Sequence, residues 1–123
     1  MYAVGKHLHA FSIDVPGSVE AYAVDGSPAD SVIVALRSNL LSTNDFALIV
    51  SGINRGDNAG LHVIYSGTVG AAREGACSNY PALALSLENH SARSKEQYEQ
   101  AAQCSVAFIK VRCLVLVSCI NSI

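Results

Sequence analysis

The alternation of strand-like and helix-like segments constrains the fold of this 123-residue chain more than any other feature. Three short apolar runs are typical of strands: residues 19–24, 46–51 and 82–87. Each is followed by a segment with helical signals: residues 28–40, 67–78 and 95–112. Such alternation implies parallel strands joined by right-handed crossovers. We therefore expect a Rossmann-like three-layer α/β/α sandwich with a mostly parallel sheet, forming one partial domain over residues 1–123.

Capping signals support two of these helices. Ser27 and Asp30 form an S-x-x-D capping box with Pro28 at the first helical position, and Ser94 with Gln97 forms a second box. The run at residues 46–51 (FALIVS) is continuously apolar, which predicts a strand buried on both faces. Residues 113–119 fit either a continuation of the last helix or a fourth strand.

The composition is unusually poor in charge. Charged residues make up 15% of the chain and hydrophobic residues 50%, against roughly 25% charged residues in an average soluble domain. A small monomer needs charge to cover its surface, so we expect this chain to be the inner part of a larger protein or one subunit of an oligomer. The net charge of −2 and the scattered basic residues argue against a nucleic-acid or anionic-membrane partner.

The apolar segments and the cysteines indicate a protein of the cytoplasm. No uninterrupted apolar run approaches the ~18 residues of a membrane span. The four cysteines form no C-x-x-C pair, and we expect buried, reduced thiols at all of them: Cys77, Cys104, Cys113 and Cys119.

A long glycine- and asparagine-rich segment, residues 52–66, is the candidate functional loop. Most βα loops have roughly 2–6 residues, and open parallel sheets bind ligands at the carboxyl ends of their strands. The segment leads into a helix at Ser66, Gly67 and Thr68, where unpaired N–H groups would favour a phosphate or carboxylate. The alternative is that Ser66 only caps the helix and the glycines only turn the chain.

The same segment lacks the motifs of common nucleotide sites but carries oxygen ligands. Neither a Walker A motif nor G-x-G-x-x-G occurs, which leaves a P-loop or dinucleotide site unsupported. Neutral oxygens of Ser51, Asn54 and Asn58 beside the carboxylate of Asp57 would suit a hard cation such as Mg²⁺.

Three linked motifs closely resemble the survival protein E (SurE) family. They are residues 22–31 (YAVDGSPADS), residues 51–60 (SGINRGDNAG) and residues 65–69 (YSGTV). The resemblance covers about residues 19–108. It implies a metal-dependent phosphomonoesterase, a 5′/3′-nucleotidase with acid-phosphatase-like breadth that hydrolyses nucleoside monophosphates, and a homodimer or higher homo-oligomer.

The resemblance also assigns site residues. The asparagine of the family's S-G-I-N motif is a ligand of a divalent Mg or Mn ion, and this maps onto Asn54. The family's phosphate-binding Y-S-G-T segment maps onto Ser66, Gly67 and Thr68, with Asn58 as a further substrate-binding residue. A bound metal ion would polarise the phosphoryl oxygen and help to activate the attacking water.

The chain departs from the family at the metal site. The family holds its ion with an Asp-Asp pair and a serine as well, but this sequence contains no Asp-Asp dipeptide, so its catalytic residues are unknown. We expect a truncated member, incomplete at both ends; the alternative is an inactive fragment that keeps a phosphate-binding loop and an oligomerisation surface. A replacement carboxylate from Asp14, Asp25 or Asp57 is not expected. His62 would serve as an acid or, preferably, shape the loop.

Overall fold

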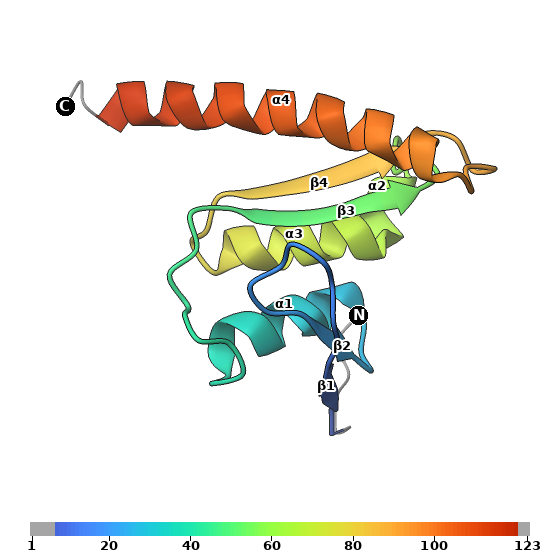
Figure 1. Ribbon diagram of the computed structural model, residues 1–123. Helices are drawn as coiled ribbons and strands as arrows, with labels where there is room; N and C mark the ends of the chain where they lie inside the picture. The colour runs from blue at the N-terminus through green and yellow to red at the C-terminus, as the bar shows by residue number, and fades with distance from the viewer. Residues whose placement is uncertain (1–6, 121–123) are drawn as a thin grey trace. The chain divides into compact units, whose positions relative to one another are not determined.

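The computed structural model describes residues 7–120, with the backbone alone for residues 112–120 (Figure 1). In chain order the elements are β1 (Ala10–Ser12), β2 (Tyr22–Val24), α1 (Pro28–Arg37), β3 (Ile49–Arg55), α2 (His62–Tyr65), α3 (Gly67–Cys77), β4 (Ala82–Leu87) and α4 (Lys95–Ile120). The chain divides into two compact units, the first formed by residues up to 52 with 58–84, and the second by residues 53–57 with those from 85 onward.

The predicted α/β fold with a parallel sheet is confirmed by the pairing of β3 with β4. The N–H of Ile49 donates to the carbonyl of Pro81, and that of Gly56 to the carbonyl of Leu87, each at 2.8 Å. Residue numbers rise together on both strands, so the strands are parallel.

Strand β3 carries one extra residue. Between the bonds at Ile49 and Gly56 the chain advances seven residues, but only six along β4. The alternation of half-buried and exposed residues along β3 breaks at Ile53 and Asn54, which are both half-buried. An extra residue of this kind is a β-bulge, a device that changes the direction of a side chain.

The first predicted strand belongs to a separate sheet. Residues 19–24 were expected in the parallel sheet, but the strand is shorter, β2, and pairs antiparallel with β1 so that Ala10 lies opposite Val24. Strand β1 was not predicted from the sequence, because a three-residue strand carries too little alternation to be recognised.

Both predicted capping boxes are confirmed. In the first unit Asp30 N–H donates to Ser27 Oγ at 3.2 Å, and Ser27 N–H donates to Asp30 Oδ2 at 2.8 Å. In the second unit Ser94 N–H donates to Gln97 Oε1 at 3.2 Å, and Gln97 N–H to Ser94 Oγ at 3.4 Å. Helix α1 stops at Arg37 rather than at residue 40, because Ser38 leaves the helical conformation.

Helices α1 and α3 pack together in the first unit. Arg37 near the end of α1 pairs with the buried Glu74 of α3 across 3.4 Å. Helix α3 ends at Cys77, and after the cap residue Ser78 the chain turns at Asn79, whose φ of 65° is the left-handed conformation that asparagine tolerates. In the second unit α4 continues to Ile120, so residues 113–119 form helix and not a fourth strand.

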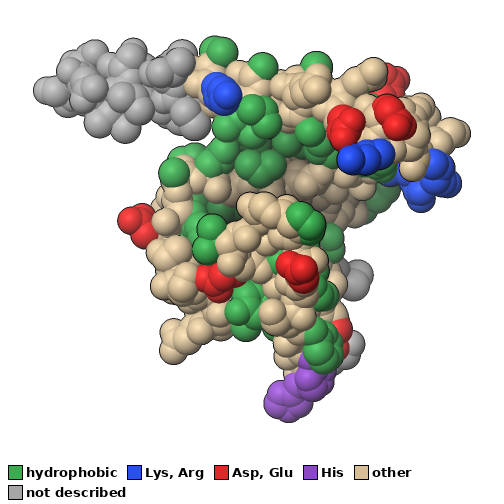
Figure 2. Space-filling view, in the orientation of Figure 1, with side chains coloured by type: hydrophobic (Ala, Val, Ile, Leu, Met, Phe, Trp, Pro, Cys, Tyr) green, Lys and Arg blue, Asp and Glu red, His purple; other side chains and the backbone are tan. Residues whose placement is uncertain are grey.

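Few large side chains are buried. The buried hydrophobic residues of the described part are all alanines: Ala29, Ala71, Ala72 and Ala92. Figure 2 shows hydrophobic side chains over much of one face, and Val19 is 97% exposed. The expectation that residues 46–51 form a strand buried on both faces is wrong, because Val50 is 43% exposed and its neighbours alternate as in a strand covered on one face.

The cysteine prediction is half right. Cys77 and Cys104 are free thiols, as expected, but both are exposed because they lie on outward faces of α3 and α4. The side chains of Cys113 and Cys119 lie outside the described residues. None of the described helices is long and apolar enough to cross a membrane.

Candidate functional site

The candidate loop is shorter than the sequence suggested. Strand β3 extends through Arg55, so most of the predicted loop's first residues are strand, and the irregular segment is residues 56–61 followed by α2. Residues 52–55 have a composition typical of turns, but they pair with β4 and form a strand. Strand formation depends strongly on the residues of the neighbouring strand.

Parts of the three motifs lie together in the first unit. A pocket of about 380 Å³ is lined by the start of α1, the middle of β3 and α3: Gly26, Pro28, Ser31, Val32, Val50, Ser51, Gly52 and Ala71. A Cβ atom built on Gly67 would lie 3.0 Å from Cγ of Pro28, so the first residues of α1 and α3 are in contact. Segments far apart in the sequence therefore form one structural neighbourhood.

Helix α3 begins with a capped turn that leaves two donors. Ser66 Oγ accepts from Val69 N–H at 3.1 Å, and the Ser66 carbonyl accepts from Gly70 N–H at 2.9 Å. The capping role weighed for Ser66 is therefore present. Within the described residues, the N–H groups of Gly67 and Thr68 make no backbone bond, and they lie at the positive end of an 11-residue helix. Such a helix end is suited to a phosphate group.

Asn54 lies at the bulge of β3, in the second unit. Its Nδ2 donates to the carbonyls of Arg55 at 3.1 Å and Gly56 at 3.0 Å. Turning the amide over would put its oxygen against two carbonyl oxygens, so the hydrogen bonds fix the orientation. The atom left to accept a bond or to ligate a cation is Oδ1.

The remaining predicted residues lie around the loop. Asn58 is half-buried in the loop and engaged in an interaction. His62 begins α2, and its backbone carbonyl accepts from Ser66 N–H at 3.0 Å. It thus helps to shape the entrance to α3, while its ring lies 5.7 Å from that of Tyr65.

A pair that the sequence analysis missed lies at the carboxyl ends of the two parallel strands. Nε2 of His90, after β4, lies 3.0 Å from Oδ2 of Asp57, after β3. No motif links the two loops in sequence. The available signal was topological, because the loops after neighbouring parallel strands lie at one edge of the sheet.

The described residues offer a divalent cation one oxygen ligand, at Asn54, without an acidic cluster around it. Asn54 Oδ1 is a suitable hard ligand. The carboxylate of Asp57 is bonded to His90, that of Asp25 accepts from His9 N–H at 2.6 Å, and no three His, Cys, Asp or Glu residues among those described lie together as a metal site. Asn54 can therefore contribute a ligand, but this part of the chain does not complete a metal centre.

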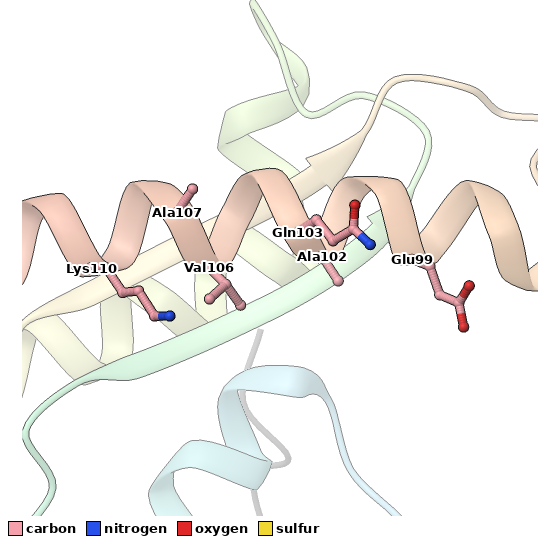
Figure 3. Close-up of a pocket in the computed structure, with 6 residues that line it drawn as sticks. All are labelled: Glu99, Ala102, Gln103, Val106, Ala107 and Lys110. Atoms are coloured by element: carbon pink, nitrogen blue, oxygen red, sulfur yellow. The ribbon is translucent and has the colours of Figure 1, made fainter.

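Another pocket, of about 600 Å³, lies along α4 (Figure 3). Its described lining comes from that helix alone: Glu99, Ala102, Gln103, Val106, Ala107 and Lys110. It includes no residue of the three motifs and no cluster of catalytic groups, so it is not the candidate site.

The profile of the family described as "Survival protein SurE" matches residues 2–121. The chain belongs to the SurE family. This match extends beyond residues 19–108, the part in which the sequence motifs carry the resemblance. The family membership predicted from the motifs is confirmed.

Relatives from two bacteria and an archaeon support the assignment. A 5′-nucleotidase SurE of Acinetobacter baumannii (strain SDF) is 49% identical over 87 residues, which are 68% of this chain and 33% of that protein. The 5′-nucleotidase SurE of Thermococcus kodakarensis is 47% identical over 83 residues, 68% of this chain and 30% of that protein. A crystal structure of the SurE protein from Aquifex aeolicus has a TM-score of 0.73 at 33% identity, covering 90% of this chain and 42% of that one. The chain thus spans about a third of the length of the curated SurE relatives it matches.

Proposed function

We propose that this chain carries the phosphate-binding part of a metal-dependent phosphomonoesterase site, a 5′/3′-nucleotidase acting on nucleoside monophosphates. The observation that carries the proposal is the start of α3, where Gly67 and Thr68 present unused N–H groups at a helix N-terminus. The SurE relatives named 5′-nucleotidases supply the substrate class.

The phosphate would be held by the backbone of the Y-S-G-T segment. The N–H groups of Gly67 and Thr68 would donate to the phosphate oxygens, joined by the hydroxyls of Ser66 and Thr68. Asn58 would contact the substrate from the preceding loop. Because Ser66 Oγ already accepts from Val69 N–H, its own proton is available for donation outward.

Asn54 would contribute one oxygen ligand to a Mg or Mn ion. When bound, such an ion polarises a phosphoryl oxygen and lowers the pKa of a bound water. The role of the chain itself is to hold Oδ1 of Asn54 in place through the two bonds that Nδ2 makes.

A second candidate is an inactive SurE-like chain that keeps the phosphate loop and associates with further subunits. Two observations favour it: the sequence has no Asp-Asp dipeptide, and the described residues form no acidic metal cluster. Exposed apolar side chains of α2, such as Ile64 at 70% and Tyr65 at 74%, would serve association. Light scattering over a range of concentrations tests the homo-oligomer, and a strict monomer would contradict it.

One titration tests the phosphate-binding loop that both candidates share. Inorganic phosphate and AMP are titrated by calorimetry and amide NMR into the unchanged chain, Thr68→Pro and Thr68→Val. Proline is tolerated in the first helical turn but removes the N–H donor, whereas valine removes only the hydroxyl. We expect the largest loss of binding in Thr68→Pro, and no binding by the unchanged chain would contradict both candidates.

Hydrolysis is then followed in the same samples with Mn²⁺ or Mg²⁺, using AMP and p-nitrophenyl phosphate. Metal-stimulated release of phosphate that disappears in Asn54→Ala would support the enzyme. Phosphate binding without turnover is the result expected for the inactive chain, and the missing aspartate pair leads us to expect it for these 123 residues alone.

A further inference from the structure

The ring of His90 has two neighbours at this edge although its side chain is 69% exposed. Nε2 lies 3.0 Å from Oδ2 of Asp57, and a Cβ atom built on Gly56 would collide with Nδ1. The backbone carbonyl of His90 accepts from Arg93 Nη1 at 3.3 Å. The ring therefore lies directly against the backbone of Gly56.

Gly56 connects this ring to Asn54. It is buried, its N–H donates to the carbonyl of Leu87 at 2.8 Å, and its own carbonyl accepts from Asn54 Nδ2 at 3.0 Å. Its φ of 94° is one that residues with a side chain rarely adopt. A side chain at this position would also displace the imidazole, so the glycine and the histidine depend on each other.

We propose that His90 is a positioning residue, which with Asp57 clamps Gly56 and thereby fixes the side-chain amide of Asn54. The proposal rests on the proposed function, in which Oδ1 of Asn54 ligates a divalent cation. The histidine is not itself a proton donor to substrate, because Nε2 is engaged by Asp57 and Nδ1 faces Gly56. Since a carboxylate only accepts hydrogen bonds, Nε2 carries the proton in neutral His90.

The first test needs no metal ion. We expect His90→Ala to speed amide exchange of Gly56 by on the order of tenfold or more, because the clamp on its N–H bond to Leu87 is lost. His90→Gln, which keeps a donor near the position of Nε2, restores most of the protection. His9→Ala changes an exposed histidine of the other unit and leaves Gly56 as it was. Long-range ¹H–¹⁵N spectra of the unchanged chain show the Nε2-protonated tautomer.

The second test uses Mn²⁺ alone, through paramagnetic broadening of the Asn54 side-chain amide signals. We expect weaker broadening in His90→Ala than in His90→Gln at equal Mn²⁺ concentration. Unchanged amide exchange at Gly56 in His90→Ala overturns the proposal, and so does the Nδ1-protonated tautomer of His90. Mn²⁺ broadening of the Asn54 signals that is present and equally strong in the unchanged chain and His90→Ala also overturns it. If the unchanged chain binds no Mn²⁺, the metal part of the proposed function fails, while Gly56 exchange still decides the role of His90.

Discussion

Gly67 and Pro28 approach each other so closely that a side chain at position 67 would press against the proline ring. A Cβ atom there would lie 3.0 Å from Cγ and 3.3 Å from Cδ of Pro28. The two residues begin α3 and α1, so this contact joins the capped start of one helix to the start of the other, where we propose that phosphate binds. The packing thus leaves little room for a side chain at position 67, whether or not a ligand approaches its backbone.

Alanine at position 67 is therefore expected to destabilise the protein. We expect Gly67→Ala to lower the free energy of unfolding by about 1–3 kcal/mol, the usual range for overpacking. Gly70→Ala in the same helix is the matched control, because nothing lies within 4 Å of its added Cβ. The free energy of unfolding of Gly70→Ala should rise by roughly 0.4–1 kcal/mol, because alanine restricts the conformations of the unfolded chain more than glycine does. Urea unfolding measures both, and equal effects would show that the Pro28 contact is not limiting.

A second glycine of α3 allows the helix to lie against β3. A Cβ atom on Gly75 would be 2.8 Å from Cδ1 of Ile49 and 3.3 Å from its Cβ and Cγ2. Gly75→Ala is expected to lower the free energy of unfolding by about 1–3 kcal/mol, because the added methyl group overpacks against Ile49. Ile49→Val removes the closest atom, so the double variant Gly75→Ala/Ile49→Val should be more stable than the sum of the two single effects predicts. Strict additivity in urea unfolding would contradict this contact.

Local signals predicted the helices well. The capping boxes at Ser27 and Ser94 each depend on residues three apart, and both form as expected. The parallel pairing of β3 with β4 followed from the order of elements alone. The capping boxes need no information about distant parts of the chain, and the parallel pairing needs only the order of the elements.

Features set by long-range pairing were not predictable. Asn54 and Gly52 have turn-forming character, but pairing with β4 holds them in a strand with a bulge. The contact of His90 with Asp57 joins residues 33 apart whose motifs are unrelated. The tight contact at position 67 depends on where Pro28 lies in space, which no local pattern encodes.

The N-cap of α1 gives a third prediction. Ser27→Ala removes the acceptor of Asp30 N–H and should cost about 1 kcal/mol, the typical value for loss of a cap. Ser27→Thr keeps the hydroxyl and should lie near the parent. Thermal unfolding followed by circular dichroism ranks the stabilities of the parent and the two variants. A Ser27→Ala variant as stable as Ser27→Thr would contradict the prediction.

The fourth prediction concerns Glu20. Hydrogen bonds from the side chain and backbone of Ser42 lower the pKa of this carboxyl below its usual 4.5. A lowered pKa in the folded protein means that the ionised form is favoured by folding, so this contribution is present above the unfolded value and is lost as the pH falls through the folded value. NMR titration of the Glu20 carboxyl should give a midpoint below 4.5 that rises toward 4.5 in Ser42→Ala. An unchanged midpoint would show that the Ser42 hydroxyl is not the cause.

The fifth prediction concerns Asn54, whose side-chain amide can donate hydrogen bonds that a carboxylate at the same position cannot. Asn54→Asp replaces Nδ2, which donates to the carbonyls of Arg55 and Gly56, by an oxygen that cannot donate. Without metal we expect a loss of about 1–3 kcal/mol of unfolding free energy, because two carbonyls lose their donor. Asn54→Ala loses the same bonds and is the matched control.

Addition of Mn²⁺ separates the two variants. A carboxylate is a preferred ligand of hard divalent cations, so Mn²⁺ should raise the unfolding midpoint of Asn54→Asp in a concentration-dependent manner, since a ligand that binds only the folded state stabilises it. Asn54→Ala should not respond, and EDTA should return Asn54→Asp to its metal-free midpoint. If Mn²⁺ shifts Asn54→Asp and Asn54→Ala equally, the cation binds elsewhere on the chain and position 54 is not a ligand.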